Sequence, residues 1–167
     1  EFFPEEGKYH YDGHRLCGIC FSPEESKQNN NNCPKCGRPL TIGVLNRVEQ
    51  LADRPEGYRD PKRVPYKSLI PLNEIIAEAL DVGVNTKSVG KEYENLIKAF
   101  GSEFNTLLEA SVSQIAAVCG KAEITEAIDR LRQGRVSIKP GFDGEFGKIK
   151  IFNESERRTL QSVQKLF

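Results

Sequence analysis

The chain has 167 residues, enough for one ordinary domain or two small ones, and 29% of them are charged while 38% are hydrophobic. These proportions indicate a soluble globular protein, and no stretch is long and apolar enough to span a bilayer. Lysine plus arginine and aspartate plus glutamate both number 24, so net charge points to no polyanionic partner, and only local clusters of cations can.

The first fifteen residues, "EFFPEEGKYHYDGHR", have neither the basic nor the apolar region of a signal peptide, which indicates a cytoplasmic protein. The chain starts at Glu1 and contains no methionine, so we interpret it as a piece of a longer protein. His10 and His14 could serve as metal ligands. Because four cysteines follow and suffice for a metal, we favour surface or packing roles for both histidines.

Four of the five cysteines form two C-x-x-C pairs, Cys17 with Cys20 and Cys33 with Cys36. Each pair tends to turn both sulfurs to one point, and two such knuckles supply the four thiolates that zinc prefers. Two structural disulfides are the alternative, but they need an oxidising compartment. We therefore predict a structural zinc ion bound by all four cysteines. Cys119 stands alone among apolar residues, which predicts a small buried side chain.

The tract between the two pairs, "SPEESKQNNNN", is polar throughout and predicts a solvated loop. Apolar residues from Val44 to Leu51 then recur at helical spacing, which predicts a short helix that leaves the finger. Residues 56–67, "EGYRDPKRVPYK", combine proline, glycine and charge as a linker does. Because this run is also the most basic one, both a solvated loop and a contact with a phosphate backbone remain open.

Further on, apolar residues follow a helical period in several segments separated by short turns with glycine. Ser111 and Gln114 have the spacing of a capping box at the start of one such segment. The predicted helices lie near 75–80, 89–100, 100–110, 111–118 and 124–133.

Two of the turns resemble helix-hairpin-helix units, in which a glycine turn and the start of the second helix face a phosphate. The first turn contains Val82-Gly83-Val84 and is followed by Lys87 and Lys91. The second has only one glycine, Gly120. A helical bundle with ordinary glycine turns is the alternative interpretation.

Toward the end, alternating apolar residues flank "PGFDGEFG", which predicts a β-hairpin with its turn near Asp143 and Gly144. Asn153 and Glu156 have capping-box spacing and predict the start of a last helix. The apolar positions of this helix are Leu160, Val163, Leu166 and Phe167.

The predicted fold class is therefore α+β and mainly helical. It combines a small four-cysteine zinc finger, a helical domain with helix-hairpin-helix-like units, and a C-terminal β-hairpin and helix. The sequence contains no Walker loop, no G-x-S-x-G and no H-E-x-x-H, so we predict no catalytic activity for this chain by itself.

Several runs resemble the region that follows the catalytic domain in endonuclease Q: "EGKYHYDGHRLCGIC", "CPKCGRPLTIGVLNRVEQLADRPEGY", "YKSLIPLNEIIAEAL", "FGSEF" and "KPGFDGEFGKI". Members of that family are metal-dependent DNA repair nucleases of the polymerase and histidinol phosphatase (PHP) superfamily. The resemblance spans nearly the whole chain. It implies that the whole protein incises DNA beside deaminated bases or at abasic sites. It also implies that a catalytic domain with its own divalent metals precedes Glu1, and that the four finger cysteines hold zinc.

On this basis we divide the chain into four parts. Residues 1–15 end or connect the missing catalytic domain, 16–55 form the finger and its exit helix, 56–70 form a basic linker, and 71–167 form the helical domain with the hairpin. The implied partners are DNA, the protein's own N-terminal catalytic domain and, as in some relatives, a fused or associated helicase; no membrane partner is expected.

The candidate DNA-binding residues are Arg38, Arg47, Arg54, Tyr58, Lys67, Lys87 and Lys91. The candidates for a base pocket or a domain contact are Tyr9, His10, Tyr11 and His14. A hypothesis of another class is a protein-interaction module that docks the finger on a catalytic or helicase domain with little DNA contact. The neutral net charge favours this alternative, and a continuous basic stripe on the surface would favour DNA.

Overall fold

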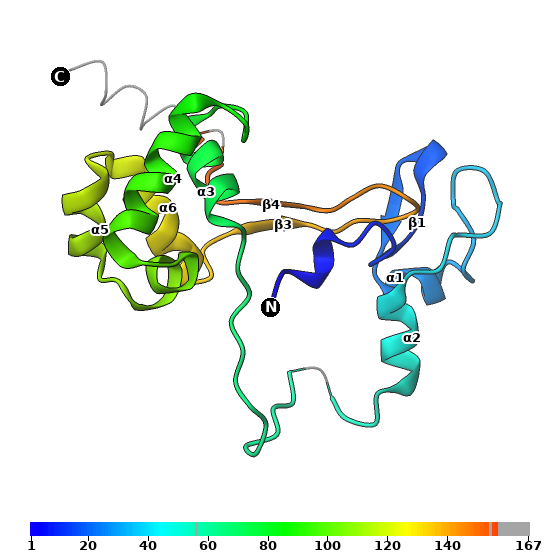
Figure 1. Ribbon diagram of the computed structural model, residues 1–167. Helices are drawn as coiled ribbons and strands as arrows, with labels where there is room; N and C mark the ends of the chain where they lie inside the picture. Colours follow the sequence, from blue (N-terminus) through cyan, green and yellow to red (C-terminus); the bar gives the residue numbers. More distant parts are fainter. Residues whose placement is uncertain (56, 154, 157–167) are drawn as a thin grey trace. The chain divides into compact units, whose positions relative to one another are not determined.

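The computed structural model describes residues 1–55, 57–153, 155 and 156 (Figure 1). Helices dominate, and two small two-stranded sheets accompany them, which confirms the predicted α+β, mainly helical class. The chain divides into two compact units. The finger unit comprises Glu1, Phe3–Lys67 and Ile138–Ile149, and the helical unit comprises Phe2, Ser68–Ser137 and the described residues from Lys150 onward. No helix in the described ranges is long and apolar enough to cross a membrane.

The finger unit is built around a short antiparallel sheet. Strand β1 (Asp12–His14) pairs with β2 (Ile19–Phe21), and Gly13 lies opposite Cys20. The 3₁₀ turn η2 (Arg15–Cys17) connects the two strands and ends at Gly18, whose φ of 64° suits glycine. Another 3₁₀ turn, η1 (Pro4–Glu6), precedes β1.

The prediction of a loop between the cysteine pairs is wrong in its first half, where helix α1 (Pro23–Gln28) forms. The Ser22 hydroxyl accepts a hydrogen bond from the Glu25 amide at 3.3 Å, and the Glu25 carboxylate accepts one from the Ser22 amide at 2.8 Å. This reciprocal capping box, with Pro23 at the first helical position, starts a helix in a polar segment. The asparagine tract that follows turns the chain, and Asn30 and Asn31 have positive φ.

The predicted helix at the exit of the finger is confirmed as α2 (Val44–Leu51). The fully buried Asp12 fixes its start: one carboxylate oxygen accepts from the Gly43 amide and the other from Asn46 Nδ2, each at 2.6 Å. Although the helix is amphipathic, Val44, Val48 and Leu51 remain 54–66% exposed. Spaced by four and three residues, they form an apolar stripe on one side of α2.

The predicted hairpin is confirmed by β3 (Ser137–Lys139) and β4 (Lys148–Lys150). Its turn, residues 140–147, is here called the strap because it packs on the first residues of the finger unit. The Gly141 amide donates to Glu5 O at 2.8 Å, and the Gly147 amide donates to Glu6 O at 3.0 Å. A Cβ atom on Gly147 would collide with the Glu5 carbonyl, so this close backbone approach requires glycine.

These backbone contacts place Ile138–Ile149 in the finger unit, whereas the sequence-based division groups the hairpin with the helices. The difference arises because the contacts join segments far apart in the chain, which no local pattern records. The four-part domain division itself stays a prediction.

Within its described residues, the helical unit packs four α-helices. They are α3 (Leu72–Leu80), α4 (Lys87–Phe100), α5 (Val112–Cys119) and α6 (Ala122–Arg132). The capping box at Ser111 and Gln114 is confirmed, and Gly120 ends α5 with a φ of 62°. The expected third helix is shorter than predicted and of π type, η3 (Asn105–Glu109), because the Ala110 amide donates to Asn105 O. The fully buried aliphatic side chains of the helical unit include Leu72, Ile75, Ile76, Leu96, Ile115, Ile124 and Ile128.

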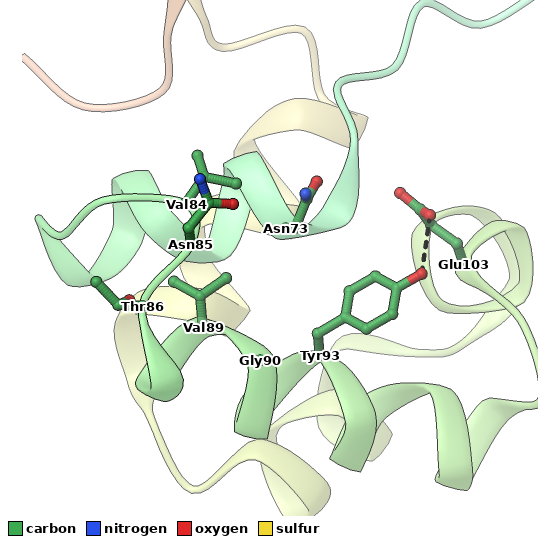
Figure 2. A pocket seen from close by; sticks show the side chains of 8 residues that line it. All are labelled: Asn73, Val84, Asn85, Thr86, Val89, Gly90, Tyr93 and Glu103. Carbon is green, nitrogen blue, oxygen red and sulfur yellow. Dashed lines mark hydrogen bonds between the residues drawn. The ribbon is translucent and has the colours of Figure 1, made fainter.

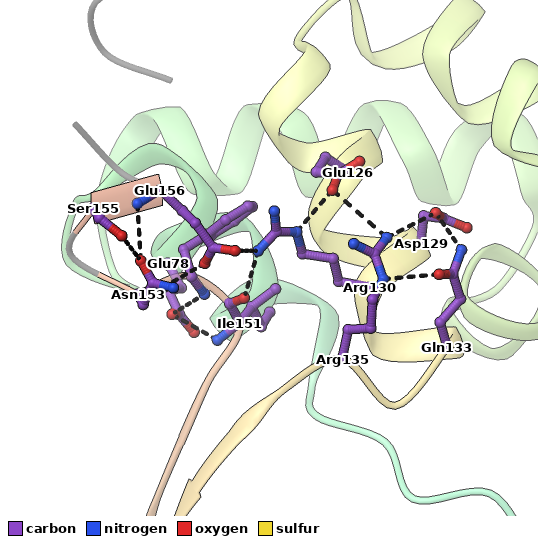
Figure 3. A network of polar contacts seen from close by, with 11 residues as sticks. Glu78, Glu126, Asp129, Arg130, Gln133, Arg135, Ile151, Asn153, Ser155 and Glu156 are labelled. Atoms are coloured by element: carbon purple, nitrogen blue, oxygen red, sulfur yellow. Dashed lines mark hydrogen bonds and ion pairs between the residues drawn. The ribbon is translucent and has the colours of Figure 1, made fainter. Parts of the chain in front are cut away.

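A polar network around Arg130 ties the chain after β4 to α6 (Figure 3). Arg130 Nε donates to Glu126 at 2.7 Å, Nη1 pairs with Glu156 at 2.8 Å, and the guanidinium lies over the Phe152 ring. Asn153 and Glu156 exchange the predicted capping hydrogen bonds, at 2.8 and 2.9 Å. The remainder of the last expected helix, with Leu160, Val163, Leu166 and Phe167, lies outside the described residues.

Candidate metal centre and basic residues

Four side chains of the finger unit bring their ligand atoms together, and we call them the metal cluster: His14, Cys17, Cys33 and Cys36. These ligand atoms all lie within 4.8 Å of one another, and Cys36 Sγ is 3.6 Å from His14 Nδ1. All five cysteines belong to the described part of the chain, and none of them is in a disulfide. The cluster therefore contains three of the four cysteines predicted as ligands, together with a histidine.

The local backbone explains how these side chains converge. His14 ends β1, and the η2 turn carries Cys17, whose carbonyl oxygen accepts a hydrogen bond from Lys35 Nζ at 2.8 Å. The second knuckle closes on itself, since the Gly37 amide donates to Cys33 O at 2.8 Å. The lysine contact thus joins the two knuckles.

Cys20 lies outside the metal cluster. It belongs to β2, where successive side chains point to opposite faces, and it pairs with Gly13. Burial and the nearby Glu25 carboxylate raise the pKa of its thiol. The spacing of the cysteines does not predict on which face of β2 the Cys20 side chain lies.

The thiols of the cluster differ in acidity. Burial, with the neighbouring thiols of Cys36 and Cys33, raises the pKa of Cys17 to about 11. Burial also disfavours the Cys33 thiolate, but hydrogen bonds from the Cys36 and Lys35 amides and from the two other thiols outweigh it and lower the pKa of Cys33 to about 7. Of these two thiols, Cys33 is the one that ionises first.

The donor set fits a zinc ion. A tetrahedral zinc with Zn–S bonds of about 2.3 Å needs its ligands roughly 3.8 Å apart. Three sulfurs and one imidazole nitrogen within 4.8 Å of one another meet this condition after a small contraction. A complete set of four protein ligands provides for folding rather than for catalysis, since it provides no place for water.

His14 was predicted to form a base pocket or domain contact with Tyr9, His10 and Tyr11, but its ring lies in the metal cluster. The rings of His10 and Tyr11 stack with centroids 5.4 Å apart, and Tyr9 lies under Lys8 Nζ. Burial is the main reason that the pKa of His10 falls below its usual value. The structure thus brings His10 and Tyr11 together, but it does not form one pocket from all four side chains. The spacing His14-x-x-Cys17 was the available signal for the histidine.

The predicted DNA-binding side chains are exposed, and several make only local contacts. Arg54 lies over the Tyr58 ring at 4.7 Å, and Arg63 repeats this arrangement over Tyr66. Arg47 Nη1 donates to Gln50 at 3.1 Å. Arg38, Arg47, Arg54, Tyr58 and Lys67 belong to the finger unit, and Lys87 and Lys91 belong to the helical unit.

Residues 71–135 match the family model described as the MJ0043 C-terminal domain. The chain is similar to the uncharacterized protein MJ0043 of Methanocaldococcus jannaschii, with 40% identity over 147 residues, 87% of this chain and 18% of that protein. It is also similar to the uncharacterized protein YqxK of Bacillus subtilis, with 33% identity over 148 residues, 88% of this chain and 34% of that protein. The chain thus spans a minor part of both relatives.

Two solved structures are similar as well. The lesion-specific endonuclease PfuEndoQ of Pyrococcus furiosus matches 92% of this chain with a TM-score of 0.77 and 33% identity. An endonuclease Q in complex with a 27-mer duplex with an abasic lesion at the active site matches 93% of it with a TM-score of 0.73 and 32% identity. The matched parts are 37% and 38% of those chains. This chain is therefore related to endonuclease Q over more than nine-tenths of its length.

Proposed function

We propose that this chain is the DNA-gripping part of a repair nuclease like endonuclease Q, and that it is not catalytic by itself. The observation that carries the proposal is the similarity to two endonuclease Q structures, one of them bound to a duplex with an abasic lesion. The whole protein would incise DNA at deaminated bases or abasic sites. A catalytic domain of the PHP superfamily, with its own divalent metals, would supply the chemistry, and a cytoplasmic location stays a prediction.

Within this proposal the finger unit holds one structural zinc ion. The sequence favours Cys20 as the fourth ligand beside Cys17, Cys33 and Cys36, whereas the geometry of the metal cluster favours His14. We assign the fourth position to His14. Zinc content of the purified His14→Ala and Cys20→Ser variants decides: we expect the first to lose zinc to a chelator readily and the second to retain it. The opposite result would restore the four-cysteine set.

Contact with DNA is proposed to run through phosphates. Thr86 caps α4 without a side-chain hydrogen bond to the backbone, so the first amides of this helix and the exposed Lys87 and Lys91 offer donors for a phosphate. The Arg54–Tyr58 and Arg63–Tyr66 pairs add cations and rings at the linker. The helix-hairpin-helix interpretation of the α3–α4 and α5–α6 turns is part of this proposal.

The test measures binding of an abasic-site duplex and of an undamaged duplex across a series of salt concentrations. Lys87→Glu with Lys91→Glu should weaken binding to both duplexes about equally and reduce the salt slope by about two, since each phosphate contact contributes about one. Lys98→Glu, two helical turns after Lys91 on α4, makes the same charge change as either single substitution, Lys87→Glu or Lys91→Glu, and serves as their control. Equal affinities of the double variant and the parent would contradict the proposed grip.

One observation favours the second candidate, a protein-interaction module. The apolar stripe of Val44, Val48 and Leu51 on α2 is exposed in the finger unit, and such a surface suits another protein domain. A catalytic domain or a helicase is the proposed partner in that case. If the lysine variants bind DNA like the parent while Val48→Asp abolishes association with the purified catalytic domain, this alternative is preferred.

A further inference from the structure

A pocket of about 330 Å³ opens between α3, the turn after it and the start of α4, wholly within the helical unit (Figure 2). This volume is at the lower end of the range of small-ligand sites, roughly 300–1,000 Å³. No sequence pattern pointed to it, because its lining comes from three separate segments. The lining residues are Asn73, Val84, Asn85, Thr86, Val89, Gly90, Tyr93 and Glu103.

The acidic end of the pocket is held firmly. Glu103 Oε1 accepts a hydrogen bond from the Leu72 amide at 2.5 Å, and Glu103 Oε2 accepts one from the Tyr93 hydroxyl at 3.3 Å. Leu72 is fully buried, so this contact anchors the carboxylate to the core. Burial and the Glu103 carboxylate together raise the pKa of Tyr93, which keeps its hydroxyl protonated. The ring and the carboxylate are therefore preorganised.

Two asparagines also line the pocket, and Figure 2 shows Asn73 between Asn85 and Glu103. Asn73 Oδ1 accepts from the Glu74 amide at 3.0 Å, which leaves its NH₂ group as a donor. Among the described residues, the Asn85 side chain has no hydrogen-bond partner, and Figure 2 shows it at the pocket beside Val84. The pocket thus presents amide donors and acceptors on Asn73 and Asn85, and acceptors on Glu103 and Tyr93.

This chemistry selects a flat, neutral ring with N–H donors at its edge. Val84 and Val89 are aliphatic and Tyr93 is aromatic, so the walls suit the faces of a ring. The Glu103 carboxylate disfavours a phosphate inside the pocket. Phosphates fit outside it, where the exposed Lys87 and Lys91 lie on α4, the helix that also contributes Val89, Gly90 and Tyr93.

We infer that this pocket receives one unpaired nucleobase of a DNA strand whose phosphates contact Lys87 and Lys91. The inference rests on the proposed DNA-binding function and adds a base-binding subsite to it. Stacking on an aromatic side chain contributes about 1–3 kcal/mol per base in single-strand binding, and this converts to roughly fivefold to more than a hundredfold in affinity. The pocket therefore predicts a preference for strands with unpaired bases.

Gly90 provides a test by obstruction. Gly90 lines the pocket, and a Cβ atom there meets no neighbouring segment within 4 Å, so Gly90→Leu adds bulk to the lining and replaces a poor helix former with a good one. The full chain is titrated with a single-stranded oligonucleotide that contains 2-aminopurine and with the matching duplex. We expect Gly90→Leu to lower the ratio of single-strand to duplex affinity at least fivefold and to reduce the quenching of 2-aminopurine. Ala99→Leu, on an exposed position of the same helix, is the control.

Asn85→Ala is a second variant. The exposed Asn85 side chain makes no hydrogen bond among the described residues, so its removal should leave the fold intact. We expect Asn85→Ala to lower the ratio of single-strand to duplex affinity about threefold. Helicity measured by circular dichroism verifies folding of each variant. If Gly90→Leu and Asn85→Ala keep the parent's ratio while Lys87→Glu with Lys91→Glu weakens binding, the pocket inference is overturned and the proposed phosphate grip stands. If the parent binds neither DNA, both fail.

Discussion

The finger unit and the helical unit are stabilised by different means. The helical unit buries a set of branched aliphatic side chains completely, including Ile76 and Ile128. The finger unit buries fewer large side chains, and its fully buried residues include Asp12 and Ser26. Backbone contacts of the strap add to its order, and the proposed zinc ion at the metal cluster would add more. A small unit with little apolar core depends on such staples, whereas a helical unit of this size does not.

Removing the metal is the strongest test of whether the finger unit depends on it while the helical unit does not. Binding of a structural zinc ion contributes about 10–16 kcal/mol to small metal-dependent folds. We therefore expect Cys33→Ser, or exhaustive chelation, to abolish amide-exchange protection in β1, β2 and α1 while most of the helical circular dichroism remains. Cys119→Ser, which changes a cysteine outside the cluster, should retain zinc. Loss of the α3–α6 signals together with the finger would show that the two units are not independent.

A cavity in the helical core tests whether the helical unit depends on its buried apolar side chains. Ile128 on α6 is fully buried, so Ile128→Ala should cost about 2–5 kcal/mol of unfolding free energy in the helical unit. Denaturant unfolding followed by helical circular dichroism measures this loss, and zinc content should not change. Val118→Ala, at a position 37% exposed, removes apolar atoms without a closed cavity and should cost far less. Similar losses for the two variants would contradict the assigned core.

Asp143 in the strap is outside the metal cluster, but its hydrogen bonds hold the backbone that carries two of the cluster's side chains. Its carboxylate accepts from the Arg15 amide, between His14 and Cys17, and from Thr41 Oγ1, each at 2.6 Å. Asp143→Asn weakens hydrogen bonds to a charged acceptor, which costs about 1.5 kcal/mol, so zinc should be lost to a chelator about tenfold more readily. Glu145→Gln, an exposed carboxyl in the same strap, is the control. Unchanged zinc retention would assign Asp143 no role in the cluster.

The smallest expected effect is a loss of stability of the helical unit at acidic pH. The amide of Asn153 and the side chain of Arg130 hold the pKa of Glu156 below its ordinary value of 4.5. A folded-state pKa below the unfolded one means that this stabilisation is complete above pH 4.5 and disappears as the pH falls through the lower folded value. The melting temperature of the helical unit should therefore fall slightly as the pH falls through that window. Glu156→Gln should flatten the dependence, and an identical acid profile for the variant would contradict the assignment.

Local patterns predicted the helical unit well, because its helices carry a complete apolar period and local caps. The capping box at Ser111 and the amphipathic α4 are examples. The finger unit was predicted less well. Helix α1 was missed although Ser22 and Glu25 have capping-box spacing, since the segment has no apolar stripe. The cysteine spacing pointed to Cys17, Cys33 and Cys36 of the metal cluster but not to His14, whose imidazole joins them only through the fold.

The strap has a consequence for the order of events during synthesis. The finger unit includes the first residues of the chain and is completed only by Ile138–Ile149, which follow α3 to α6 in the sequence. A growing chain therefore exposes an open finger, with its cysteines already made, throughout translation of the helices. Closure must then join ends separated by a whole folded unit, whose compactness keeps the entropic cost lower than that of a flexible loop of the same length. The finger is therefore completed last, after the helices that separate its two parts in the sequence have been made.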